Sequence, residues 1–144
     1  MIARTCRTLM LVAWCAVASP APLDESTVQR TGLSAAQARQ VLRVVLRHER
    51  FPVGKAGFYI ETLASGNRGY REFGVTFESP QAAATTVLGA FAVSRMTGDV
   101  WETNLCKRYA FPELEQLQAR IMKRTHQTFA TEVGERRKLG CSDE

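Results

Sequence analysis

Residues 72–78, with the sequence EFGVTFE, decide the fold class of this 144-residue chain. Phe73, Val75 and Phe77 alternate with glutamate, glycine and threonine, and this period of two is typical of a β-strand with one buried face. The preceding segment FYIETL, residues 58–63, also has strand composition, and the turn-rich sequence SGNRG lies between the two segments. The pair predicts two adjacent antiparallel strands.

Two more strands are expected, at residues 85–94 and 99–103. The first is rich in threonine, valine and phenylalanine, which fit a pleated sheet. Residues 95–98, with the sequence RMTG, separate the two strands, and Gly98 can adopt the positive φ of a tight hairpin turn. Residues 81–84, QAAA, could form a helical turn before this hairpin.

Two helices are expected to cover the sheet. Ser34 is placed as the N-cap of a helix that ends near residue 48, and Pro112 opens a second helix that reaches about residue 131. Their apolar residues recur at helical spacing and are Ala38, Val41, Leu42 and Val45 in the first helix and Leu114, Leu117, Ile121, Thr125 and Phe129 in the second. This order predicts an α+β fold, in which an N-terminal and a C-terminal helix cover a curled antiparallel sheet of about four strands.

Residues 1–18 are expected to be a cleavable secretory signal peptide. Arg4 and Arg7 precede a mostly apolar run, and the small residues of the sequence AVA place cleavage after Ala18. The apolar run is about half the ~20 residues that a membrane-spanning helix needs. A retained membrane anchor and lipid attachment at Cys15 remain open as alternatives.

The rest of the chain is expected to hold one domain in the periplasm. Residues 19–32 lack apolar periodicity and are predicted to form a flexible leader, whereas residues 33–144 are predicted to form a single α+β domain. Signal removal takes away two of the 19 Lys and Arg residues and none of the 14 Asp and Glu residues, which leaves a net charge of about +3. This charge is too small to indicate a nucleic-acid-binding surface, and we expect no stable membrane insertion.

Cleavage would also remove Cys6 and Cys15 and leave Cys106 and Cys141. Two cysteines in an exported domain predict one disulfide. It would close a loop of about 35 residues and hold the C-terminal tail against the body of the domain. Two free buried thiols are the alternative.

Neither a catalytic nor a metal-binding constellation is evident in the sequence. His48 and His126 are the only histidines, and neither has a partner at metal-ligand spacing or a nucleophile motif beside it. Alternation along the strands explains Glu61, Glu72 and Glu78 as exposed residues rather than as an acid and base pair. We therefore expect no enzymatic activity, no metal and no cofactor.

Residues 90–102, AFAVSRMTGDVWE, resemble the hairpin of small exported α+β domains of the cystatin-like, PepSY-like and NTF2-like kind, in which a strand meets Thr-Gly-x-Val-Trp and turns back. Domains that look like this are commonly non-catalytic, and they inhibit or escort peptidases or act as periplasmic immunity proteins. The resemblance implies a protein that occludes the active site of a toxic, cell-wall-directed effector, such as a type VI secretion amidase, in a toxin-antitoxin pair. The expected partner is thus an exported or injected effector or hydrolase.

Two loops beside the strands are the candidate partner-binding sites, because Arg, Tyr, Trp and Met are enriched at protein interfaces. The candidate residues are Arg68, Tyr70, Arg71, Arg95, Met96, Asp99 and Trp101. Trp101 could instead be a core residue, and both loops could be ordinary surface.

A second hypothesis is a periplasmic domain that binds a small ligand in a pocket between the sheet and the first helix. The pocket would be lined by Val41, Val45, Phe73, Val75 and Phe77. The sequence predicts neither the identity of the partner nor the oligomeric state.

Overall fold

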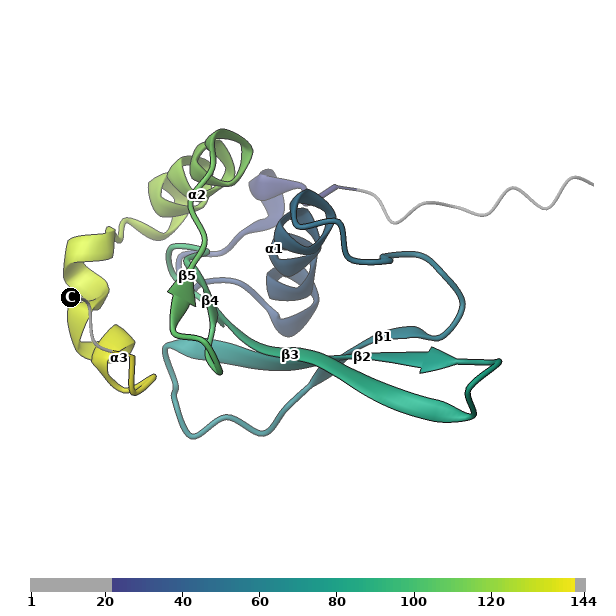
Figure 1. The fold of residues 1–144 in the computed structure, drawn as a ribbon. Helices are drawn as coiled ribbons and strands as arrows, with labels where there is room; N and C mark the ends of the chain where they lie inside the picture. The colour runs from purple at the N-terminus through teal and green to yellow at the C-terminus, as the bar shows by residue number, and fades with distance from the viewer. Residues whose placement is uncertain (1–21, 142–144) are drawn as a thin grey trace, which may run out of the picture.

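A five-stranded antiparallel sheet forms the centre of the computed structural model, which describes residues 22–141 (Figure 1). The strands neighbour one another in sequence order, and their bounds are β1 Phe58–Thr62, β2 Tyr70–Ser79, β3 Ala84–Ser94, β4 Val100–Glu102 and β5 Lys107–Arg108. The structure confirms the α+β class and the antiparallel sheet. β5 was not predicted from the sequence. It consists of two exposed basic residues, and these give no periodic pattern of apolar residues from which a strand could be recognised.

Helix α1, Ala35–His48, covers one face of the sheet, which we call the inner face (Figure 1). The Ser34 Oγ accepts a hydrogen bond from the Gln37 N–H at 3.2 Å, and the Gln37 Oε1 accepts one from the Ser34 N–H at 2.9 Å. This reciprocal pair is a capping box, which satisfies two backbone donors at the start of the helix. The predicted N-cap and length of this helix are confirmed.

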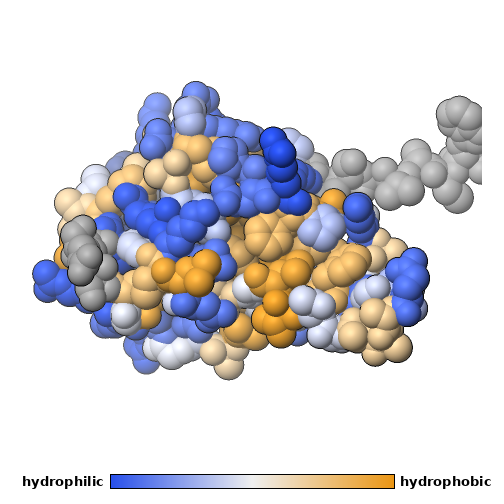
Figure 2. All heavy atoms as spheres, viewed as in Figure 1, coloured by the Kyte–Doolittle hydropathy of each residue, from blue (hydrophilic) through white to orange (hydrophobic). Residues whose placement is uncertain are grey.

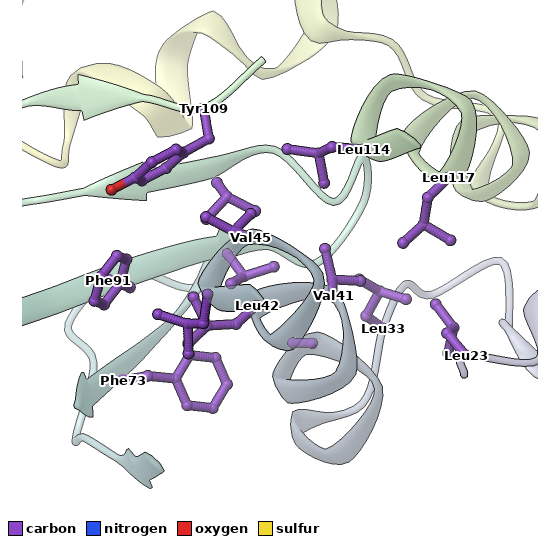
Figure 3. Close-up of a cluster of buried hydrophobic side chains, with 14 of the residues drawn as sticks. Leu23, Leu33, Val41, Leu42, Val45, Phe73, Phe91, Tyr109, Leu114 and Leu117 are labelled. Atoms are coloured by element: carbon purple, nitrogen blue, oxygen red, sulfur yellow. The ribbon is translucent and has the colours of Figure 1, made fainter. Parts of the chain in front are cut away.

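The main core lies between α1, helix α2 (Pro112–Thr125) and the inner face of the sheet. Figure 3 shows Leu42 of α1 beside Phe73 of the sheet and Val41 of α1 beside Leu33. Among the core side chains, none of Val41, Leu42, Val45, Phe73 and Phe91 is more than 1% exposed. The same packing argues against the hypothesis of a small-ligand pocket between the sheet and the first helix. Four of the residues expected to line that pocket fill the core, and the fifth, Phe77, lies half-buried at the sheet. The structure therefore does not support a pocket between the sheet and α1.

The β3–β4 hairpin forms at the predicted place. The Ser94 N–H donates to the Asp99 carbonyl at 2.8 Å, and Gly98 has a φ of +71°. A side chain at residue 98 would also be crowded, since an added Cβ would lie 2.8 Å from the Ile121 Cδ1. Glycine is thus required here both by the left-handed backbone and by the close approach of α2.

The second helix is shorter than predicted. α2 ends at Thr125, because His126 adopts a left-handed conformation with a φ of 57°. A 3-10 turn at Phe129–Glu132 and helix α3 at Val133–Arg137 follow, so Phe129 does not belong to the apolar stripe of α2. The break redirects the chain, and Figure 1 shows α3 beside the opposite end of the sheet from the β2–β3 turn.

The predicted flexible leader is wrong for residues 22–32, whereas residues 1–21, including the predicted signal peptide, lie outside the described residues. Leu23 and Val28 are buried against the main core. The Arg120 Nε donates to the Glu25 carboxylate at 2.6 Å and ties the 3-10 turn Glu25–Thr27 to α2. The buried residues Leu23, Val28 and Leu33 recur at intervals of five, which matches neither the helix nor the strand period.

The face of the sheet opposite α1, the outer face, carries a second, smaller core at the β4 end. It consists of Tyr70, Ala92, Trp101 and Cys141, with Leu139 packed against it. Cys141 forms the predicted disulfide with Cys106, so the C-terminal tail is linked to the turn between β4 and β5. Within residues 22–141, the structure contains no helix with the length and apolarity needed to cross a membrane.

We predict that replacing both disulfide cysteines, Cys106→Ser and Cys141→Ser, lowers the free energy of unfolding by about 3–4 kcal/mol, because the bond closes a loop with a sequence separation of 35. Urea unfolding of the oxidised protein and the double variant measures this loss. Dithiothreitol should lower the stability of the wild type to that of the double variant and leave the variant unchanged. Equal stability of the two oxidised proteins would show that noncovalent contacts alone hold the tail.

Candidate protein-binding surface

Three of the seven candidate binding residues lie inside the protein. Tyr70 is 1% exposed, Asp99 is 0% exposed and Trp101 is 3% exposed. The prediction that these three anchor a partner is therefore wrong, because the C-terminal segment covers them on the outer face. Trp101 is a core residue, which was the open alternative for that position.

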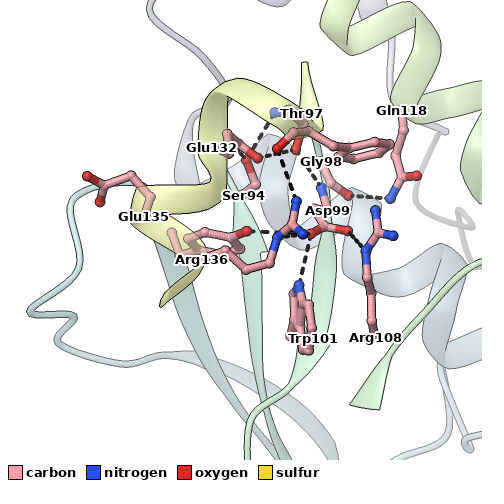
Figure 4. Close-up of polar contacts among 12 residues, drawn as sticks. Ser94, Thr97, Gly98, Asp99, Trp101, Arg108, Gln118, Glu132, Glu135 and Arg136 are labelled. Atoms are coloured by element: carbon pink, nitrogen blue, oxygen red, sulfur yellow. Dashed lines mark hydrogen bonds and ion pairs between the residues drawn. The ribbon is translucent and has the colours of Figure 1, made fainter. Parts of the chain in front are cut away.

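The Asp99 carboxylate is the centre of a buried polar network (Figure 4). Its Oδ2 accepts a hydrogen bond from the Trp101 Nε1 at 2.8 Å, and the Tyr70 hydroxyl lies 3.5 Å from the same oxygen. The Arg108 Nε donates to Oδ1 at 2.7 Å, and the Arg136 Nε forms an ion pair with Oδ2 at 3.7 Å. The network thus joins β2, the β3–β4 hairpin, β5 and α3 through one side chain.

A second buried carboxylate, that of Glu132, fastens the C-terminal segment to the same hairpin. It accepts hydrogen bonds from the Ser94 hydroxyl and, at 2.6 Å, from the Thr97 hydroxyl. The Thr97 hydroxyl also accepts from the Asp99 N–H at 3.2 Å, so it connects the two carboxylates. Burial raises the pKa of Glu132, and the nearby negative charge of Asp99 acts in the same direction, whereas its hydrogen bonds and Arg136 lower it.

The polar groups of this network make their contacts within the fold. Burial raises the pKa of the Tyr70 hydroxyl far above its usual range, which keeps it a neutral hydrogen-bond donor. His48 stacks on the Phe111 ring with centroids 3.8 Å apart, and His126 is the C-cap residue of α2. Among the residues that the structure describes, no group of three or more His, Cys, Asp or Glu side chains could hold a metal ion.

The other candidates, Arg68, Arg71, Arg95 and Met96, reach the surface at one end of the sheet. Arg71 and Arg95 line a shallow groove of about 380 Å³ beside the start of α1. The Arg95 guanidinium lies 3.4 Å from the carbonyl of Arg68, whose side chain is exposed. Met96 packs over Gly32, so it supports the wall of the groove. The structure therefore brings these four candidates together, as a basic patch.

A second exposed surface, which the sequence analysis missed, is the free end of the β2–β3 ribbon. We call residues 76–87 the arm; it begins where the register of β2 and β3 shifts between Val75 and Thr76. α1 has 14 residues and spans about 21 Å, whereas β3 has 11 residues and spans about 36 Å. The helix is therefore too short to cover the whole ribbon, and Figure 1 shows the arm extending past it.

The arm combines apolar side chains with a free backbone edge. Tyr59 of β1, Thr76 and Val87 are direct neighbours across three strands, and Val87 is 70% exposed. One edge of β3 pairs with β2, and the other edge pairs with β4 only at Phe91–Val93. Within residues 22–141, the second edge of β3 therefore has no partner strand along the arm. Figure 2 shows hydrophobic surface continuing along β3 toward the end of the arm.

One sequence signal could have located the arm. Residues 79–94 contain no charged residue, although 23% of the chain is charged. An edge strand of a soluble protein is usually protected by charge, proline or a covering element. An uncharged, exposed edge strand is a common site of protein recognition, because its backbone groups can form hydrogen bonds with a partner and its side chains can pack against that partner.

The fold and these surfaces define a small α+β protein whose buried polar groups stabilise its own core and whose basic patch and arm are exposed. Its sequence matches the family described as T6SS (type VI secretion system), Immunity protein Tgi2PP, over residues 32–133. This match spans more than half of the chain, and the protein belongs to that family of immunity proteins.

A solved structure agrees with this assignment. The chain is similar to a chain in the structure of a type VI secretion system effector-immunity complex from Pseudomonas protegens, with 39% sequence identity and a TM-score of 0.79. The similarity covers 84% of this chain and 99% of that chain. A comparison with curated proteins gave no match. The predicted immunity class is confirmed, whereas the cystatin-like, PepSY-like or NTF2-like fold is not.

We predict that Glu132 makes the protein less stable as pH rises. Because its pKa is raised in the folded state, the folded protein holds this proton at pH values where the unfolded chain has lost it. The contribution of Glu132 to the free energy of unfolding is therefore full below pH 4.5, the ordinary pKa of a glutamate, and it is lost as pH rises through the raised pKa of the folded state.

The test compares the wild type with Glu132→Gln by urea unfolding from about pH 4 to 7. The free energy of unfolding of the wild type minus that of the variant should fall as pH rises. Exposed carboxylates with lowered pKa values, such as Glu25 and Glu49, act in the opposite direction but are present in both proteins and cancel. A difference that stays constant, or that rises with pH, would contradict the assignment.

Proposed function

We propose that this protein is a periplasmic immunity protein that neutralises a type VI secretion effector by covering its active site. The membership of residues 32–133 in an immunity-protein family is the observation that carries this proposal. The similarity to a chain of an effector-immunity complex supports an effector protein as the partner. The protein acts as a non-enzymatic inhibitor, because a folded surface that blocks a cleft needs no catalytic group.

Two features support the periplasm as the compartment. The first 18 residues have the pattern of a secretory signal peptide. Cys106 and Cys141 form a disulfide, and disulfides persist in oxidising compartments such as the periplasm. An immunity protein in that compartment would meet an effector that attacks the cell wall. The expected effector is thus a cell-wall hydrolase, with an amidase as one case.

The arm is the element best shaped to occlude an active site. It extends beyond the helix-covered body and has a narrow end formed by the turn between Ser79 and Ala84 (Figure 1). Its edge and its exposed Val87 offer backbone hydrogen-bond groups and apolar surface without charge from residue 79 onward. The body behind it is held by the Asp99 network, so the arm is presented from a rigid base. The inhibition is steric, since no bond is made or broken.

The function is tested with a candidate type VI secretion effector from the same genome, expressed with a signal peptide in a sensitive host. The effector alone should stop growth, and coexpression of the complete immunity protein should restore it. A version without residues 1–18 should remain in the cytoplasm and give no protection.

Purified mature protein should form a stoichiometric complex with the effector, seen by size-exclusion chromatography. Failure to bind and protect would refute the immunity function, and protection by the leaderless version would refute the periplasmic site of action.

We predict that negative charge on the arm prevents occlusion. The double variant Gln81→Glu and Val87→Glu changes two exposed arm residues and should weaken effector binding at least about tenfold, measured by calorimetry, because the charges must be desolvated in the effector cleft. The control Gln116→Glu and Ala119→Glu adds the same charge at two exposed positions of α2. Both variants should unfold at similar temperatures. Equal binding by both would exclude the arm as the occluding element.

A further inference from the structure

The groove beside the start of α1 contains two arginines whose charges have no acidic partner within residues 22–141. Arg71 lies on β2, and Arg95 follows the last residue of β3. The other lining residues are neutral; they are Thr27, Gln29, Thr31, Gly32, Leu33, Ser34 and Gln37. A groove lined by two guanidinium groups and no carboxylate has a strongly positive potential, and the N-terminal end of α1 adds to it.

The hydrogen-bonding capacity of both arginines is largely unused. Within residues 22–141, Arg71 makes no ion pair and no side-chain hydrogen bond. The Arg95 guanidinium reaches only the backbone carbonyls of Arg68 and Thr31, at 3.4 Å each. The Nε atoms of Arg71 and Arg95 are buried and have no hydrogen-bond partner. Each guanidinium therefore keeps donors that lack an acceptor in the described part of the free protein, and an acceptor from a partner would be favourable at the N–H groups that face the groove.

The backbone holds the two arginines in a fixed relation. The Arg95 N–H donates to the Gly69 carbonyl at 2.9 Å, and the Arg95 carbonyl accepts from the Leu33 N–H at 2.7 Å. Arg71 is paired with Val93 in the β2–β3 ladder. Because the backbone of each arginine is already fixed, little backbone entropy is lost when its guanidinium binds a partner, and this favours tight pairing.

We infer that this groove is a socket for an acidic side chain of the effector, whose carboxylate pairs with Arg71 and Arg95. A guanidinium matches a carboxylate with two parallel N–H···O bonds, and such charge-assisted pairs are among the strongest hydrogen bonds in proteins. The net charge of about +3 that remains after removal of residues 1–18 also favours an acidic partner surface. This inference rests on the proposed function, because it names what one part of the same binding surface recognises.

Removal of each charge tests the socket in the complex with the effector that the protein neutralises. Arg71→Met and Arg95→Met should each weaken binding by about ten- to a hundredfold, measured by calorimetry in about 50 mM NaCl. Arg47→Met is the matched control, because Arg47 is exposed at the other end of α1. Because Arg71 has no partner in the free protein, Arg71→Met should leave the unfolding temperature unchanged or raise it.

Salt dependence and charge reversal separate the socket from a general basic surface. Binding of the wild type should weaken as NaCl rises, and the Arg71→Met and Arg95→Met double variant should show a flatter dependence than the control. Arg71→Glu should bind poorly, and one Asp→Arg or Glu→Arg change among the surface acids of the effector should restore its binding. Rescue by a single acidic position identifies the residue that enters the groove.

The outcomes distinguish the two proposals. If the wild type does not bind the effector, the proposed function fails. If the wild type binds and the two arginine variants bind equally well, the socket alone is overturned. If Arg47→Met loses as much affinity as Arg71→Met, the attraction comes from overall charge and the socket is again overturned.

Discussion

The buried carboxylate of Asp99 is the interaction on which the remaining structure depends. A charged group at 0% exposure is stable only when its hydrogen bonds and counter-charges are complete. Here they come from Trp101, Arg108 and Arg136, which lie on three different elements. Removing any one element would leave the carboxylate incompletely paired, so the hairpin, β5 and α3 are held together as a unit.

The two faces of the sheet are covered in different ways, and this difference leaves the arm exposed. α1 and α2 bury the inner face in a continuous apolar core. The outer face is covered only near β4, where Trp101 and Cys141 pack with the C-terminal tail. The tail reaches that place through the Glu132 contacts and the disulfide, and neither extends to the other end of β3. The Glu132 contacts and the disulfide therefore cover the outer face near β4, and the arm at the other end of β3 stays exposed.

Local patterns in the sequence predicted the elements but not which side chains they bury. The alternation around Phe73, the N-cap at Ser34 and the turn at Gly98 are each determined within a few residues, and each is confirmed. Tyr70 and Trp101 were named as candidate binding residues, with a core role as the open alternative for Trp101. The segment that covers them follows a helix break at His126. That cover depends on contacts between residues 29 to 38 positions apart, which no local period reports.

The candidate surface was predictable to the same extent. The arginines of the basic patch belong to loops that the sequence singled out, whereas the groove needed the Gly32 loop, which local patterns assigned to a leader. The uncharged stretch of the arm is visible in the sequence. Its exposure is not, because it follows from the difference between the rise per residue of a helix and that of a strand.

The positions of the arm and the socket constrain the complex that the protein can form. The tip of the arm and the socket lie at opposite ends of β3, whose 11 residues span about 36 Å. An effector that contacts both must bury an interface at or above the ordinary ~800 Å² per partner. The arm, which is uncharged from residue 79 onward, would supply shape and apolar contact, and these do not discriminate strongly between similar clefts. The two unpaired arginines would supply discrimination, because an effector without the matching carboxylate would leave them desolvated and unpaired.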